Sequence, residues 1–556
     1  MDSLEIVKRF DALVSQRKTV EDIWEVINQL VVPFRGDFFR DVSSEHSVSW
    51  RDNRNIFDST AVDAAHILAS SIHGSLTSPA IRWFELAFRS NRLNEVKEAR
   101  QWLEEAASLC FTALQDSNFN LEANETYLDL VSYGTSMIIE EVEEKNGQFL
   151  RLNFQSVPVE EMWFEQDHAG QTHRAYRRHK WTPVQIITKF GDKVPQSIKD
   201  KAATPQGMDV KEDVVMCIYP REDKINADTS KTLAPDQRPY GMKYVLHKEA
   251  TDLGEEGGYY EMPCFVPRWR KTSKSMWGHG PAMIALPDIL TINSLVELIL
   301  KATEKVVDPP TKVTERGLLS DLDLEPAGLT VVRTMDSMEP YESGARFDVS
   351  QLQRDQLEAK IRSIFFVDQL ELKESPAMTA TEVQTRYELM QRLLGPTLGR
   401  LQSDYLDPLV QRTFNILYRA GVLGEPPEIV FEDSGQLDII YTGPLVRAQR
   451  ADIAQGVMRW AATLVELAEV TPDVLDIPDW DEIARELGSL EGVPAKLMRG
   501  EGDIKKARKD RQTKMARAEQ AAQAQEEGAG MEALGKGQMA LREVNGAEEG
   551  TAGEAA

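Results

Sequence analysis

The feature that most constrains this chain is a long apolar helix near its middle, predicted for Pro281–Val306. Its apolar residues recur at spacings of four, three, four and three, which makes a heptad seam of Ala285, Ile289, Ile292, Val296 and Ile299. The helix would be about 39 Å long, and several leucines lie off the seam. Because it is apolar on more than one side, its own chain or neighbouring subunits must cover it on more than one side.

A membrane span is the alternative reading of the same stretch. Residues 282–300 are mostly apolar, but they include Pro287, Asp288 and Glu297. Charges at the centre of a bilayer are costly. The sequence therefore predicts no membrane span.

The segments before and after this helix have different patterns. Helical periodicity at Val20–Val31, from Thr60 onward and at 103–114 is followed by β-rich runs, including 136–142 and 149–159, which predicts an α+β body over residues 1–280. Asp308-Pro309-Pro310 ends the long helix, and residues 350–366 are again helical. Two helices therefore flank a small insert.

The remainder of the chain is predicted to be mainly helical. A loop at 367–378 precedes a long helix over 379–420, which Pro396 and Pro408 should kink. Glu428–Glu432 and Leu437–Tyr441 are predicted as the two strands of a hairpin. The last segments are predicted as helices at 445–469 and 480–487, then a tail beyond residue 511 that is rich in Ala, Gln, Glu and Gly. The fold class is α+β, mainly helical.

The charge excludes one class of function. Lys and Arg number 64 against 90 Asp and Glu, which gives a net charge of −26, so a protein that binds nucleic acid by neutralising phosphates over its whole surface is not expected. Two basic clusters that contain aromatic residues, 174–181 and 268–277, could contact nucleic acid or an acidic partner, or could form a locally basic face.

Enzyme-like motifs are incomplete. Residues 530–536 fit G-x-x-x-x-G-K, but Gly537 stands where a phosphate loop needs Ser or Thr. Residues 278–283 are a fragment of a dinucleotide fingerprint without its third glycine. One helix face carries a polar stripe, which lacks the exposed turn and oxyanion hole of a serine nucleophile: Asp63, His66, Ser70 and His73.

Metal-binding patterns are also not found. His168, His173 and His179 are spaced by five and six residues, which matches no zinc helix. The acidic groups at 140–144 and 321–325 fit no calcium loop and are interpreted as solvated faces. We predict no catalytic residues, no cofactor and no metal.

Several long motifs, taken in order, resemble the portal, or head-to-tail connector, proteins of short-tailed bacteriophages. They are Ser75–Leu86, Tyr133-Gly134-Thr135, Trp277–Val313, Thr379–Gly421 and Gly443–Arg450. None is a catalytic signature; their number and order carry the resemblance, which extends over most of residues 1–510.

The resemblance implies a viral portal fold in a ring of usually about twelve identical subunits around a central channel. It implies the following regions: wing, 1–280 and 379–446; stem helices, 281–306 and 350–366; clip, 307–349; channel loop, 367–378; crown, 447–510; flexible tail, 511–556.

The implied role is a structural conduit for double-stranded DNA, bound without sequence specificity, at one vertex of the virion capsid. The implied partners are further copies of the chain, the terminase motor, tail adaptor or tube proteins, and capsid and scaffolding proteins, with assembly in the host cytoplasm. Another head-tail ring, such as an adaptor, or an enzyme of the packaging machine are the alternatives. The channel-lining candidates are Asp288, Asn293, Glu297, Lys301, Lys305, Asp368, Glu371, Lys373 and Glu374, and the acidic clip residues are Asp321, Asp323 and Glu325.

Overall fold

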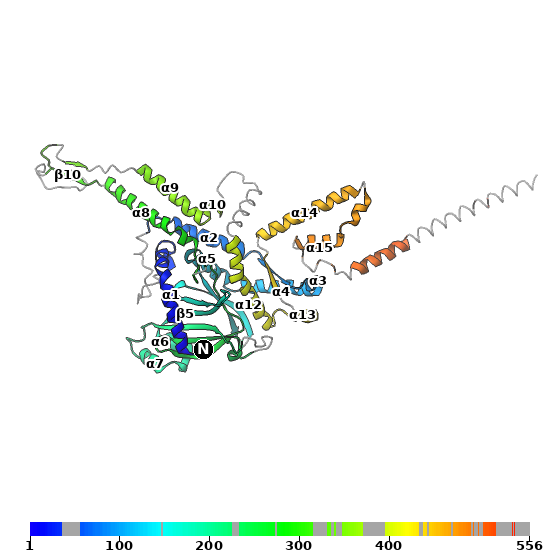
Figure 1. Ribbon diagram of the computed structural model, residues 1–556, viewed down its shortest axis with the longest axis horizontal. Coiled ribbons are helices and arrows are strands. Elements are labelled where there is room, and N and C mark those ends of the chain that lie inside the picture. Colours follow the sequence, from blue (N-terminus) through cyan, green and yellow to red (C-terminus); the bar gives the residue numbers. More distant parts are fainter. Residues whose placement is uncertain are drawn as a thin grey trace, which may run out of the picture. The chain divides into compact units, whose positions relative to one another are not determined.

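A five-stranded antiparallel sheet of order β4-β5-β6-β7-β8 forms one part of the body, in the computed structural model drawn in Figure 1. Helix α1 (Ser3–Leu30) packs across it, so that Ile6, Phe10 and Leu13 join a core with Trp163 and Tyr176. The alternation of buried and half-buried residues along these strands provides that apolar face.

The structure describes the following residues: 1–35, 56–145, 148–224, 233–272, 275–307, 309–314, 331–334, 338–340, 347–370, 395–432, 437–441, 444–468, 471–490 and 504–518, with the single residues 493, 497, 499, 536 and 539. The chain divides into two compact units. Unit 1 comprises Met1–Ala87, Leu103–Pro426 and Leu437–Gln449, and unit 2 comprises Phe88–Trp102, Pro427–Gln436 and Arg450–Ala556.

The remaining elements have these bounds. The other helices are α2 (Thr60–Leu76), α3 (Asn91–Glu95), α4 (Lys97–Gln115), α5 (Phe119–Tyr133), α6 (Pro183–Phe190), α7 (Gln196–Ala202), α8 (Pro281–Val307), α9 (Phe347–Ile364), α10 (Val367–Leu370), α12 (Asp407–Arg419), α13 (Glu428–Glu432), α14 (Pro444–Ala468) and α15 (Trp480–Leu490). The strands are β1 (Phe84–Phe88), β2 (Met137–Lys145), β3 (Gln148–Val157), β4 (Met162–Gln166), β5 (Thr172–Trp181), β6 (Glu212–Pro220), β7 (Tyr240–Leu246), β8 (Thr251–Tyr259), β9 (Cys264–Phe265), β10 (Thr311–Val313), β11 (Met338–Pro340) and β12 (Leu437–Tyr441). Beside the large sheet are a three-stranded sheet, β3-β2-β9, and two strand pairs, β1-β12 and β10-β11.

The predicted α+β class is confirmed, and most predicted helices and strands match observed elements. Helix α5 was not predicted, because it is buried on nearly every side, including Thr126, Asp129 and Ser132, and so lacks an apolar stripe. The predicted hairpin is wrong. Glu428–Glu432 is a helical turn that follows Pro426-Pro427, whose fixed φ angles favour a helix start, while Leu437–Tyr441 is a strand whose partner is β1.

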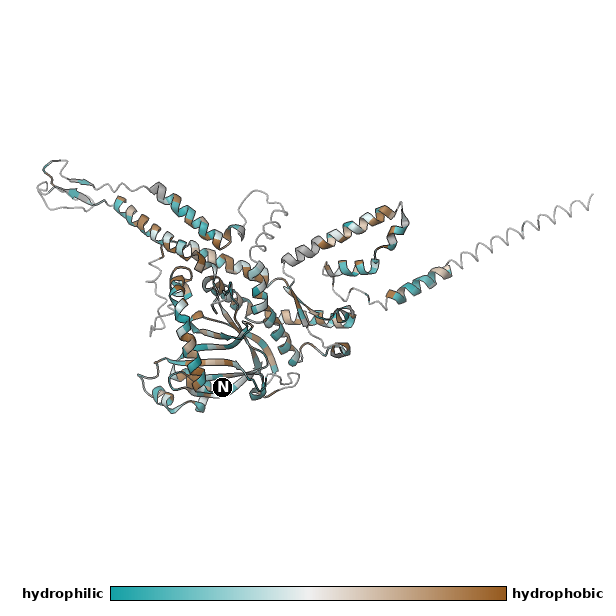
Figure 2. Cartoon of the chain, viewed as in Figure 1, coloured by the Kyte–Doolittle hydropathy of each residue, from teal (hydrophilic) through white to brown (hydrophobic). Residues whose placement is uncertain are grey.

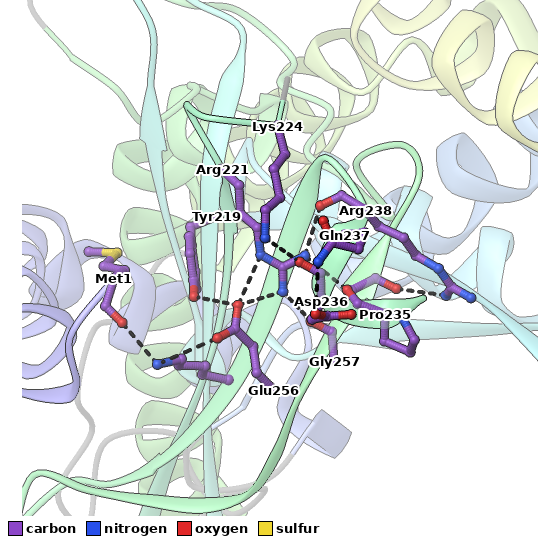
Figure 3. A network of polar contacts seen from close by, with 12 residues as sticks. Met1, Tyr219, Arg221, Lys224, Pro235, Asp236, Gln237, Arg238, Glu256 and Gly257 are labelled. Carbon is purple, nitrogen blue, oxygen red and sulfur yellow. Dashed lines mark hydrogen bonds and ion pairs between the residues drawn. The ribbon is translucent and has the colours of Figure 1, made fainter. Parts of the chain in front are cut away.

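A buried arginine holds the edge of the large sheet and the chain's first residues together (Figure 3). Arg221 donates to the Glu256 carboxylate at 2.9 Å and to the backbone carbonyls of Pro235, Arg238 and Gly257. Tyr219 donates to the same carboxylate, and Lys243 donates to the carbonyl of Met1 at 3.0 Å. This guanidinium uses its donors inside the fold, so its charge has a structural role.

A second ionic cluster attaches α12 to the three-stranded sheet. The interpretation of 140–144 as a solvated face is wrong at Glu140 of β2, whose carboxylate is fully buried. Arg412 lies 3.4 Å from this carboxylate and donates to the carbonyl of Glu261 at 2.9 Å. Arg419 pairs with Glu261 at 2.6 Å, and Thr413 donates to Glu140 at 2.8 Å. Burial raises the pKa of Glu140 to about 7, which outweighs the opposite effects of Arg412 and Thr413.

Three glycines bring α5 and α8 into backbone contact. Gly134 ends α5 with φ of +75°, and a Cβ atom there would lie 2.4 Å from the amide nitrogen of Gly280 and 2.6 Å from the carbonyl oxygen of Gly278. The amide of Gly278 donates to the Thr135 hydroxyl at 2.8 Å. The fragment that resembled a dinucleotide fingerprint is therefore explained by close packing at the start of α8.

We predict that Gly134→Ala lowers the stability of the fold by roughly 2–4 kcal/mol, because the alanine would have a positive φ and would overlap Gly280. Gly74→Ala is the matched control in helix α2, since nothing lies within 4 Å of the position that its Cβ atom would take; it should raise stability by up to about 1 kcal/mol. Thermal unfolding midpoints measure both changes. Equal midpoints for the two variants would contradict the role of the junction.

The raised pKa of Glu140 predicts a pH dependence of stability. Between its ordinary value of 4.5 and about 7, the folded chain holds a proton that the unfolded chain releases, so stability falls as pH rises. Glu140→Gln removes this titration, and wild type should lose up to a few kcal/mol relative to the variant between about pH 5 and about pH 8. Unfolding midpoints at both pH values test this, with the exposed Glu144→Gln of the same strand as control. If the difference in unfolding midpoint between wild type and Glu140→Gln were the same at both pH values, the raised pKa of Glu140 would be contradicted.

Candidate functional site: the α8–α9 helix pair

Helices α8 and α9 lie side by side and form the candidate site (Figure 1). The predicted helix 281–306 matches α8, and the inner half of its heptad seam is buried at Ala285, Ile289 and Ile292. Burial of this inner half fixes α8 to the body beside α2 and α5.

The outer half of α8 is only partly covered. The seam residues Val296 and Ile299 are half-buried, and exposed apolar side chains include Leu298 at 63%, Leu300 at 53% and Val307 at 79%. Apolar residues recur along the whole helix in Figure 2. An exposed apolar surface of this kind is typical of a protein–protein contact.

A tight reversal joins α9 to α10. Ile361, Phe365 and Val367 are almost completely buried, and Phe366 between them has φ of +60°. The loop predicted from residue 367 is therefore wrong for Val367–Leu370, which form α10 because Val367 packs into the body. Residues 371–378 lie outside the described residues.

Two of the polar channel-lining candidates have partners outside α8. The Asp288 carboxylate forms an ion pair with Lys360 of α9 at 2.7 Å, and its side chain is only 16% exposed. Asn293 accepts a hydrogen bond from the amide of Phe57 at 2.8 Å. The sequence did not indicate Lys360, because nothing local relates residue 360 to residue 288.

The other candidates lie on exposed surface or beyond the described residues. Glu297 and Lys301 form an ion pair along α8 at 2.6 Å, and Lys305 and Asp368 are exposed. The following candidates fall outside the described residues: Glu371, Lys373, Glu374, Asp321, Asp323 and Glu325.

The insert between the two helices contains a short antiparallel pair. Thr311 of β10 lies opposite Pro340 of β11, and Val313 lies opposite Met338. Helix, paired strands and helix therefore follow one another, as the sequence predicted for a small insert between two helices.

The predicted kinked helix contains a π turn at Gln402–Leu406, between helical residues 395–401 and α12. The amide of Asp407 donates to the carbonyl of Gln402 five residues earlier. Pro408 has no amide hydrogen, and the wider turn gives its ring room. Residues 379–394 lie outside the described residues.

The enzyme-like stripe of α2 is a solvent-facing surface. Asp63, His66 and Ser70 are exposed, while His73 contacts the Thr77 hydroxyl at 2.8 Å. Within the part of the chain that the structure describes, no group of three His, Cys, Asp or Glu side chains could hold a metal ion. Burial lowers the pKa of His179, which stacks on Trp181, to about 3.

The basic clusters lie largely against carboxylates of the body. Arg174 pairs with Glu165 at 2.8 Å, Arg177 with Glu161 at 2.9 Å, and Arg268 with Asp404 at 3.0 Å. These guanidinium charges have internal partners, which favours a structural role over nucleic-acid binding.

Among the described residues, α8 is the one helix whose length and apolar composition would suffice to cross a membrane. Its inner half packs on protein, and Asp288 and Glu297 of this helix form ion pairs. We therefore identify it as a protein-packed helix and not a membrane span.

Comparison with known proteins places these features in a family. The chain is 28% identical over 538 residues to the probable portal protein of Bordetella phage BPP-1, covering 93% of this chain and 92% of that protein. It is 25% identical over 528 residues to the portal protein of Salmonella phage epsilon15, with the same coverage. A chain from the neck of an empty GTA particle, computed with C6 symmetry, matches with a TM-score of 0.33 and 9% identity, covering 75% of this chain and 91% of that chain, a level that does not show a shared fold. The family described as bacteriophage head to tail connecting protein matches residues 4–498. The resemblance found in the sequence is thereby confirmed, and this chain belongs to the bacteriophage head-to-tail connecting proteins.

Proposed function

We propose that this chain is the subunit of a portal ring of about twelve copies at one vertex of a phage capsid. Double-stranded DNA would pass through the ring during packaging and ejection. The terminase motor, tail proteins, capsid proteins and scaffolding proteins would dock on it, and the ring itself would have no catalytic activity.

The main support for this proposal is the apolar surface of α8 that stays exposed in a single chain of this family. Leu298 and Leu300 are 63% and 53% exposed, although their helix is apolar on several sides. In a ring each α8 has a neighbour on both sides, so these leucines would be covered by other subunits.

The regions keep the roles expected from the resemblance. Residues 281–306 and 350–366 would be the stem helices, residues 307–349 the clip, and residues 367–378, which begin with the short helix α10, the channel loop. Residues 1–280 and 379–446 would be the wing, 447–510 the crown and 511–556 a tail.

Negative charge near the channel would let DNA slide without binding tightly. Residues 307–349 carry four Lys and Arg against nine Asp and Glu, and residues 367–378 carry one against three. A protein that pairs few phosphates releases few counterions, so it gains little of the free energy that holds DNA. Lys301, Lys305 and Lys373 would supply weak, repeated phosphate contacts.

The stem contact is tested by Leu298→Ser combined with Leu300→Ser. Since both leucines are exposed in the single chain, its folding should be retained, while the population of rings should fall several-fold because less apolar surface is buried between copies. Leu121→Ser, at a body leucine that is 75% exposed, is the control. Negative-stain images and mass photometry count the rings. The proposal would be overturned if the double variant formed as many rings as wild type. It would also be overturned if the wild-type protein were a stable monomer that hydrolyses ATP.

The channel role is tested by replacing Asp368, Glu371 and Glu374 with lysine. Added positive charge should retain DNA through phosphate contacts and lower the yield of packaged or ejected genomes at least several-fold. The control makes the same charge change at exposed body residues, Asp209, Glu222 and Asp223. Genome yield per assembled particle is the measurement. Equal yields for both triple variants would contradict the proposed position of this loop.

A further inference from the structure

A cleft of about 440 Å³ lies in unit 1 between the β9 region and the π turn of the kinked helix. Cys264, Phe265 and Arg268 line one wall, and Asp404, Asp407 and Gln411 line the other. This volume is in the range of ligand-binding pockets in proteins. Its walls combine apolar side chains with hydrogen-bond acceptors, so the cleft suits a group that has both an apolar part and a donor.

One carboxylate of this cleft has no counter-ion in the part of the chain that the structure describes. The charge of Asp404 is balanced by Arg268, which is 3% exposed and donates to it at 3.0 Å. Asp407 accepts a hydrogen bond from the Tyr441 hydroxyl, and no Lys, Arg or His of the described residues lies within ion-pair distance of it. Burial raises the pKa of Asp407, and the nearby Asp438 raises it further. A cation bound beside Asp407 would offset both increases in its pKa, because a cation favours the charged carboxylate.

The π turn is what brings the two carboxylates to the same cleft. Ser403, Asp404, Asp407 and Gln411 all line it, at spacings that follow one helix face through the widened turn. Turns of this type occur frequently at functional sites in helices.

Arg268 also has unused donors. Its Nη2 donates to Asp404 and to the carbonyl of Gly170, whereas its Nε and Nη1 have no hydrogen-bond partner among the described residues. Arg221, in contrast, uses all three nitrogens (Figure 3). Leaving a buried donor without an acceptor costs free energy, and the carbonyl oxygen of a ligand at this wall would provide that acceptor.

We propose that this cleft binds a polypeptide segment of a partner through a lysine or arginine side chain, whose cationic end pairs with Asp407. The aliphatic stem of that side chain lies along Phe265 and Pro408, since such stems pack on apolar surface while their charged ends contact acceptors. A backbone carbonyl of the segment lies near Arg268. The unpaired carboxylate excludes a phosphate group, so DNA is not the occupant. This function is additional to DNA passage and does not depend on it.

The test measures peptide binding to the purified full-length protein by titration calorimetry. The probes are acetyl-Gly-Arg-Gly-amide, its lysine counterpart, and the same tripeptide with norleucine or glutamate in the middle. The arginine and lysine peptides should bind at least about tenfold more tightly than the norleucine and glutamate peptides, because only they supply a charge-assisted hydrogen bond. Equal binding of arginine and norleucine peptides would overturn the proposal.

Two variants assign the binding to the cleft. Asp407→Asn keeps an oxygen for Tyr441 but removes the charge, and should weaken the arginine peptide about tenfold; Asp209→Asn, at an exposed residue that does not line the cleft, should not change it. Gln411→Glu adds a carboxylate to the wall and should strengthen the same binding several-fold, which keeps the test decisive if Asp407→Asn fails to fold. Binding that is unaffected by the change at Asp407, or by that at Gln411, would refute the assignment.

Discussion

The close backbone contact of Gly134 with Gly278 and Gly280 is the constraint on which the rest of this structure depends. It sets the point at which α8 leaves the body, and it requires residues without side chains on both segments. The Thr135 hydroxyl adds a hydrogen bond to Gly278, and Trp24 packs against Trp277 at a centroid distance of 5.1 Å. The direction of α8, and therefore that of α9 beside it, follows from this junction.

Buried arginines are the second recurring feature of this acidic chain. Arg17 contacts backbone carbonyls after β3 and lies 3.7 Å from the centre of the Trp163 ring, while Arg221 and Arg412 join other segments of the body. Each guanidinium provides several donors in a fixed plane, which suits the linking of chain segments distant in sequence. Four arginines of the described residues are buried in this way, Arg17, Arg221, Arg268 and Arg412, in a chain whose net charge is −26. A strongly negative net charge disfavours tight binding of DNA phosphates.

The α8–α9 pair shows how far local patterns predict a site. The heptad seam correctly predicted the buried residues of the inner half, since Ala285, Ile289 and Ile292 face the body. It did not predict that Asp288 pairs with Lys360, because that contact joins helices separated by the whole insert. The same limit explains the missed α5, whose polar residues are buried by several surrounding elements, and the strand wrongly predicted at Glu428–Glu432.

The sequence by itself determined the α+β class, the approximate bounds of helices such as α8, α9 and α14, an irregularity at Pro408 and the family, because periodicity, prolines and motif order are properties of neighbouring residues. Only the tertiary structure decided which charges are neutralised. It paired the basic clusters with body carboxylates, left Asp407 without a cation among the described residues and joined the two glycine motifs. These outcomes depend on distances between residues far apart in the chain, and electrostatic and steric energies change steeply with such distances.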